Sequence, residues 1–211
     1  MKKSIALVMM AVLLVAASVM GTLAYLTSTA SVTNTFTVGK VAIKLDEAAA
    51  NTDGTLVPNA DRVKTNSYKL LPGHTYNKDP MVTVLAESEP SYIKMTVTFS
   101  KANELDAIFA PTGADLTSIF NGYDAANWIA KGNTKDANAN TRTYEFWYKE
   151  TVGAPDGDVA LDALFDSITV PGNITQEQLA TIEGMTITVN AYAIQADGSD
   201  TADAAWAKFS N

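Results

Sequence analysis

Side chains that commonly perform chemistry are scarce in this sequence. The chain has one histidine, His74, and no cysteine among its 211 residues. His74 follows the turn pair Pro72-Gly73, a position typical of an exposed turn residue. A single histidine without cysteine cannot build a usual zinc site, and we find no serine-nucleophile elbow, phosphate loop or dinucleotide fingerprint. The sequence therefore predicts no catalytic residue, no bound cofactor and a protein that is not an enzyme.

Carboxylates are the one abundant reactive group, with 23 aspartates and glutamates. A pair of them could serve a hydrolase, but no spacing in the chain selects a pair. Solvating acids on the surface are the simpler interpretation, and a carboxylate-based hydrolase stays open as a third hypothesis.

Three aspartates near the C-terminus, Asp197, Asp200 and Asp203, are candidate calcium ligands. They lack the twelve-residue loop with a terminal glutamate. The alternative is a turn followed by a helix that Thr201 caps, with acids in its first turn. The run at 136–140 is a second candidate of the same kind.

Aromatic residues at Tyr144, Trp147 and Tyr148 could form a sugar-binding face. On an alternating strand, such residues also pack in a core or against a sheet. Both interpretations remain open from the sequence.

The charge balance excludes some partners. Formal net charge is −8 and the isoelectric point is about 4.6. Nucleic acid and anionic membrane surfaces attract clustered lysine and arginine, so neither is an expected partner.

The N-terminal residues have the pattern of an export signal. Lys2 and Lys3 precede an apolar run, and no further charge appears before Lys40. Residues 22–24 suit signal peptidase, which places the cut between Ala24 and Tyr25. Removal of 24 residues and two lysines leaves 211 − 24 = 187 residues with charge 13 − 23 = −10. The alternative is an uncleaved anchor, because 5–26 is long enough to span a bilayer. We expect a secreted or cell-surface protein that meets the membrane only before cleavage.

The rest of the sequence has the period of β-strands. Apolar residues alternate with polar ones along several segments, and turn pairs such as Asp53-Gly54 separate them. These segments are 41–45, 81–85, 92–99, 143–149, 165–170 and 186–194. The pattern predicts an all-β, jelly-roll-like antiparallel β-sandwich with short peripheral helices, in one domain over 25–211.

Helical signals are short. A capping box at Thr175 opens a helix through Ile182, and Thr201 caps a final one. The β pattern stops from 100 to 141, where we expect an excursion of short helices (103–110, 115–121 and 124–130) and a polar loop (131–140).

Residues 25–38 look like a strand without a partner. Val32, Asn34, Phe36 and Val38 fall on one face, with threonines on the other. The segment has neither charge nor proline, so nothing protects its edges from pairing. It could pair within its own sandwich, form a flexible tail, or add to a second molecule.

Several motifs resemble the TasA/camelysin family of exported proteins. The strongest are Thr-Leu-Ala-Tyr-Leu-Thr at 22–27 and Asn-Thr-Phe-Thr-Val-Gly at 34–39, followed by 41–45. Weaker ones occupy 71–84, 91–94 and 191–198. The resemblance does not cover 100–141.

This resemblance implies a subunit of Gram-positive biofilm-matrix fibres, released by a SipW-type signal peptidase. In that family, subunits join head to tail by donor-strand exchange, which assigns 25–38 as the donor and other matrix components as further partners. Some relatives carry a metalloprotease label, which the absent ligands do not support here. The alternatives are an exported monomeric module that binds carbohydrate or caps fibres and, third, the hydrolase.

Overall fold

The computed structural model describes residue 9 and residues 39–109 and 120–209. The chain divides into two compact units, Met1–Val38 and Gly39–Asn211. The fold described below is that of the second unit.

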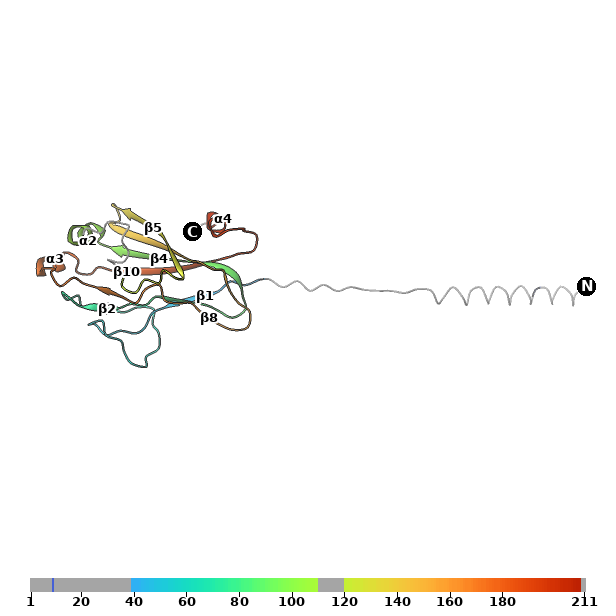
Figure 1. The fold of residues 1–211 in the computed structure, drawn as a ribbon, viewed down its shortest axis with the longest axis horizontal. Coiled ribbons are helices and arrows are strands. Elements are labelled where there is room, and N and C mark those ends of the chain that lie inside the picture. Colours follow the sequence, from blue (N-terminus) through green and yellow to red (C-terminus); the bar gives the residue numbers. More distant parts are fainter. Residues whose placement is uncertain (1–8, 10–38, 110–119, 210–211) are drawn as a thin grey trace, which may run out of the picture. The chain divides into compact units, whose positions relative to one another are not determined.

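Two layers of antiparallel strands form this unit (Figure 1). The larger sheet has the order β10-β4-β6-β5, and β7 continues along the same side of β4 as β6. The second layer contains the sheet β1-β3-β8 and the pair β2-β9. The strands are β1 (Ile43–Asp46), β2 (Thr75–Asn77), β3 (Met81–Val84), β4 (Ser88–Ser100), β5 (Trp128–Asp136), β6 (Thr141–Tyr148), β7 (Val152–Ala154), β8 (Val159–Ala160), β9 (Ser167–Thr169) and β10 (Ile187–Gln195). The expected all-β class and antiparallel sandwich are confirmed.

The alternating segments form strands because their apolar sides share one core. On β4, Ile93, Met95 and Val97 are fully buried, while the residues between them face outward. Rings of Phe120 and Phe165 stack at 4.4 Å in the same core. Without disulfides, burial of this kind and the strand ladders hold the unit together.

Three short helices lie at the periphery of the described unit: α2 (Ala102–Phe109), α3 (Gln176–Thr181) and α4 (Ala202–Ala207). The capping box of α3 is confirmed, since Thr175 Oγ1 accepts from the Gln178 backbone amide and Gln178 Oε1 accepts from the Thr175 backbone amide. Thr201 likewise caps α4 by accepting from the Ala204 amide.

The prediction for 100–141 is partly wrong. The helix near 103–110 is α2, but the predicted helix at 124–130 and loop at 131–140 are the turn and strand that lead into β6. Trp128 is the one fully buried residue of β5, whose other positions are mostly exposed. A bulge between Ala130 and Gly132 also shifts the register. An exposed, bulged edge strand shows little alternation, so the sequence pattern misses it. Residues 110–119, which include most of the predicted helix at 115–121, lie outside the described residues.

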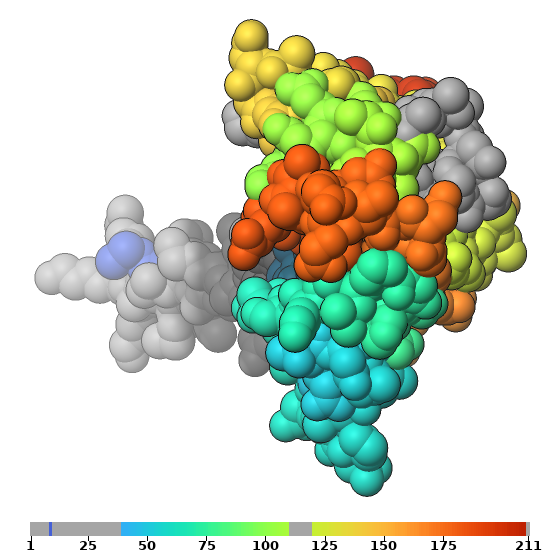
Figure 2. Space-filling model, turned by 90° about the vertical axis from the view of Figure 1, so that its left-hand side faces the viewer, coloured from blue at the N-terminus to red at the C-terminus, as the bar shows by residue number. Residues whose placement is uncertain are grey.

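A long connection from β1 to β2 stands out from the sandwich (blue to cyan in Figures 1 and 2). At the base of this connection, the Arg62 side chain donates hydrogen bonds to Asp46 Oδ1 at 2.6 Å and to Asp79 Oδ2 at 2.8 Å. The connection also carries the exposed Leu56 and Val57.

Candidate functional site

A groove of about 1720 Å³ lies between the two layers of the described unit. One wall comes from β1 and the segment 64–70, and the other from β10 and Phe99 of β4. Residues of α2 and α3 close one end. Figure 2 views that end, with α3 in orange between α2 and the segment around β2.

The groove runs beside strands that end their sheets. Within the described residues, β10 pairs only with β4, and β1 is the last strand of its own sheet. Such edges carry unpaired backbone N–H and C=O groups. The open side of the sandwich therefore offers backbone partners to an additional strand.

The register of β10 shows which backbone groups are free to pair. Ser100 N donates to Thr186 O, and Ala196 N donates to Pro90 O. Hydrogen-bonded pairs alternate along an antiparallel ladder, so the even-numbered residues of β10 bond to β4. The odd-numbered ones, including Val189 and Ala191, turn their N–H and C=O groups toward the free edge.

The opposite edge of the larger sheet is protected, whereas β10 is not. Strand β5 carries Lys131 and Lys135 and a bulge, features that discourage edge-to-edge pairing. Strand β10 reads Ile-Thr-Val-Asn-Ala-Tyr-Ala-Ile-Gln, with nine residues in regular register and no charge or proline. The unprotected edge is the one beside the groove.

The apolar lining of the groove is incompletely covered. Ile43, Leu45, Ile187 and Val189 pack against the core, yet each stays partly exposed, in contrast to the fully buried inner side of β4. Leu179, Ile182 and Met185 extend this apolar lining at the α3 end.

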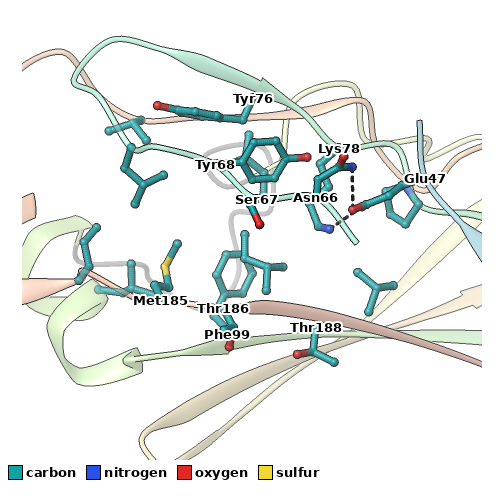
Figure 3. Close-up of a pocket in the computed structure, with 18 of the residues that line it drawn as sticks. Glu47, Asn66, Ser67, Tyr68, Tyr76, Lys78, Phe99, Met185, Thr186 and Thr188 are labelled. Carbon is teal, nitrogen blue, oxygen red and sulfur yellow. Dashed lines mark hydrogen bonds and ion pairs between the residues drawn. The ribbon is translucent and has the colours of Figure 1, made fainter. Parts of the chain in front are cut away.

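Charged and polar residues also line the groove, and we call three of them, Glu47, Asn66 and Lys78, the Glu47 cluster (Figure 3). Lys78 Nζ lies 2.5 Å from Glu47 Oε2, and both residues are buried. Asn66 Nδ2 donates to Glu47 Oε1 at 3.0 Å. Burial and the charge of Glu47 raise the pKa of the neighbouring Tyr68 to about 12. This tyrosine stays neutral and donates to Asn77 O.

Beside this cluster, Asp46 is buried and ionised. Burial opposes its ionisation, but hydrogen bonds from Lys44 and Arg62 outweigh that cost and hold the pKa of Asp46 below its ordinary value. The charges at the base of the groove are thus fixed in place and neutralised by near neighbours.

The residues predicted to act at the N-terminus lie outside the described residues. These are the cleavage pair Ala24 and Tyr25, and the assembly residues Val32, Asn34, Phe36 and Val38.

The calcium candidates belong to the start of α4. In the described residues, no group of three or more His, Cys, Asp or Glu side chains could hold a metal ion, and Asp197, Asp200 and Asp203 do not converge. Asp203 lies in the first turn of the helix that Thr201 caps, 3.4 Å from Lys131 Nζ. In the second run, Asp136 Oδ1 accepts from the Asn138 and Ala139 amides. The turn-and-cap interpretation accounts for both runs.

The proposed sugar-binding face is covered. Tyr144 is in the core, and Tyr148 packs edge-on against Trp128 at 5.0 Å. Trp147 lies on the outer face of the sheet beneath α4, 6.2 Å from the ring of Trp206. His74 is exposed in its turn, as expected.

No protein-family model, curated protein or solved structure matches this chain. Across the described ranges, no helix combines the length and apolar character needed to cross a membrane.

The sequence did not reveal the groove. Its lining comes from β1, the 64–70 segment, α2, α3 and β10, which are far apart in the chain. The one local sign was the uncharged, regular run at 187–195, whose alternation is that of any strand.

Proposed function

We propose that this protein is a secreted structural subunit or accessory of extracellular biofilm-matrix fibres, and that residues 25–38 of one copy add as a strand to the next. The observation that carries the proposal is the groove beside the unprotected edge of β10. Strand addition at such an edge gives main-chain hydrogen bonds for affinity and side-chain pockets for specificity.

The donor and the acceptor are chemically matched. Residues 25–38 carry no charge and no proline, and the groove offers partly exposed apolar side chains of β1 and β10 beside an edge with unpaired backbone groups. An acceptor at one place and a donor at another on the same chain form a heterologous contact, which generates a filament if it does not close.

Export supports the same proposal. The basic start and apolar run of residues 2–20 address the chain to the outside, and removal of 1–24 would free Tyr25 as the end of the donor. A signal peptidase of the SipW type is the proposed processing partner. The alternative, an exported binding module, loses its predicted aromatic face because Tyr144 and Trp147 are buried.

The test compares two chains, one starting at Tyr25 and one at Gly39. The longer chain is expected to form fibres visible by electron microscopy, and the shorter one is expected to stay monomeric. Circular dichroism and a cooperative melt show whether the shorter chain is folded. Fibres from a folded chain that lacks 25–38 would exclude the donor-strand proposal.

A further inference from the structure

The Glu47 cluster brings an amine, a carboxylate and a carboxamide into contact. The two nitrogen atoms reach the two oxygens of one carboxylate, since Lys78 Nζ lies 2.5 Å from Glu47 Oε2 and Asn66 Nδ2 lies 3.0 Å from Glu47 Oε1. Figure 3 shows both side chains turned toward that carboxylate. The amine of Lys78 and the carboxamide of Asn66 are therefore held close to each other by a group that can carry a proton between them.

The backbone holds the amine and the carboxylate in place. Glu47 directly follows β1, and its backbone N–H and C=O both pair with Val63. Lys78 directly follows β2, and its backbone N–H donates to Asp166 O at 3.0 Å. Both residues are more than nine-tenths buried. Groups that a fold holds rigidly at contact react as though they were at very high concentration.

The carboxamide of Asn66 is oriented for attack by a nucleophile. Its nitrogen donates to Ala48 O at 2.9 Å as well as to Glu47, and its oxygen accepts from the backbone N–H of Ala50 at 2.9 Å. A backbone N–H at this position stabilises the negative charge that develops on a carbonyl oxygen when a nucleophile adds to the carbon. The site thus supplies a nucleophile, a proton carrier and a donor for the oxyanion.

A buried ion pair is the simplest interpretation of Lys78 and Glu47. Burial makes such a pair costly, because the attraction between the charges seldom exceeds the free energy of removing both from water. The neighbouring acids do not need this lysine, since Arg62 pairs with both Asp46 and Asp79. A reaction that turns the lysine into a neutral amide removes a buried charge and keeps the segments together.

We infer that Lys78 and Asn66 form an intramolecular amide cross-link, with Glu47 as the proton carrier. Glu47 takes a proton from the Lys78 ammonium, and the neutral amine attacks Asn66 Cγ, so that the Nζ–Cγ bond forms and an oxyanion develops beside the Ala50 N–H. Glu47 then passes a proton to Nδ2, the Cγ–Nδ2 bond breaks, and ammonia leaves through the groove that the cluster lines. In balance, an ammonium group and a carboxamide become a secondary amide and an ammonium ion, without oxidant or reductant.

The cross-link closes the chain between Asn66 and Lys78 into a covalent loop. It joins the long connection after β1 to the end of β2, and so fixes one wall of the groove. Covalent loops of this kind stabilise a fold mainly by restricting the unfolded chain, which is also how a disulfide acts. This chain has no cysteine, so an amide is the covalent bond that its own side chains can supply.

Mass spectrometry of a tryptic digest of the purified protein tests the cross-link. Trypsin cuts after lysine and arginine, so separate side chains give the peptides 65–69 and 70–78. With the amide in place, trypsin cannot cut after Lys78. The peptide 65–69 is then expected to stay attached to 70–94, and the mass of the product should be one ammonia molecule below the sum of the two. Fragmentation is expected to place the bond between Asn66 and Lys78.

Substitutions separate the reaction from the packing of the site. Lys78→Arg keeps a positive charge beside Glu47 but has no amine, and Glu47→Gln keeps the shape of the carboxylate but cannot carry the proton. Each variant is expected to give unlinked peptides. Lys69→Arg changes an exposed lysine of the same connection and is the matched control, which should keep the cross-link. Circular dichroism shows whether each variant is folded.

The digest of the unsubstituted protein decides the inference even where a variant fails to fold. Folded protein that gives only the separate peptides 65–69 and 70–78 would overturn it. A cross-link to 65–69 that persists in Lys78→Arg would overturn it too, because another amine must then have reacted. Ammonia loss without an attached peptide has the same consequence, since it shows a change at one side chain alone. None of these results depends on residues 25–38, so the proposed function is tested separately.

Discussion

Arg62 ties the long connection after β1 to the sandwich. Its guanidinium joins Asp46 at the end of β1 to Asp79 before β3, and also donates to the carbonyl oxygens of both. These contacts hold the long connection after β1 against the sandwich and keep the Glu47 cluster beside the groove.

Arg62→Leu is expected to lower the free energy of unfolding by about 2 kcal/mol, because it leaves the buried Asp46 with only Lys44 as a cationic partner. Urea denaturation followed by circular dichroism measures the change. Lys64→Leu removes an exposed positive charge in the same connection and should stay within about 0.5 kcal/mol. A similar loss in both variants would show that the ion pairs of Arg62 are unimportant.

Acid should destabilise the folded unit Gly39–Asn211 by protonating Asp46. Hydrogen bonds from Lys44 and Arg62 overcome burial and lower the pKa of Asp46 from its ordinary 3.8, so the folded state binds fewer protons. The stabilisation is then complete above pH 3.8 and is lost as the pH falls through the folded-state pKa. Thermal melts at pH 7 and pH 3 measure it. The fall in melting temperature from pH 7 to pH 3 should be smaller in Asp46→Asn. An unchanged fall would show that other acidic residues cause it.

At the scale of elements, the proposed assembly requires the free edge of β10. Ala191→Pro removes an N–H that points to the free edge, so the ladder to β4 keeps its hydrogen bonds. We expect this variant to fold, with a melting temperature close to that of the parent, and to form no fibres by electron microscopy.

Asn190→Ala is the matched control for this edge. Its side chain is exposed and its backbone pairs with β4, so fibre formation should persist. Normal fibres from Ala191→Pro would place the added strand elsewhere than at β10.

Elements were predictable where the sequence pattern was strong. Strand β4 buries every second residue, and the capping box at Thr175 is complete within four residues. Strand β5 was missed because its edge position leaves it with one fully buried residue, Trp128, and a bulge. The sequence also did not show that α4 covers Trp147, because Trp147 and Trp206 of α4 are almost 60 residues apart in the chain.

At the scale of the whole molecule, we propose that the folded unit is an incomplete sandwich, which residues 25–38 of another copy complete. A synthetic peptide of residues 25–38, added to the chain starting at Gly39, should raise its melting temperature in a concentration-dependent way. Binding to the native state alone stabilises by about 2.7 kcal/mol at a hundredfold excess over Kd. Differential scanning fluorimetry measures the shift.

The specificity of this peptide effect has its own control. A peptide of the same composition with Asn34 and Phe36 exchanged keeps the hydrophobicity but changes the order of side chains along one face of the strand. An equal shift of the melting temperature with both peptides would indicate non-specific binding and contradict recognition of the side-chain order.

The sequence by itself determined the class of the fold and suggested a role for residues 25–38. These predictions rest on local features, namely the alternation along 92–99 and 186–194, the turn pairs and the helix caps. Such features can be read from neighbouring residues without the tertiary structure. For the same reason, the uncharged residues 25–38 could be predicted to form a strand available for pairing, a prediction that lies outside the described residues.

Only the tertiary structure decided where an added strand could go. The free edge of β10, the groove beside it and the Glu47 cluster arise from segments distant in the chain that meet when the two layers pack. Edge and centre strands share the same period of two, because that period reflects the backbone alone. Which strand ends a sheet, and which side of the sandwich stays open, depends on contacts between layers that no local pattern records.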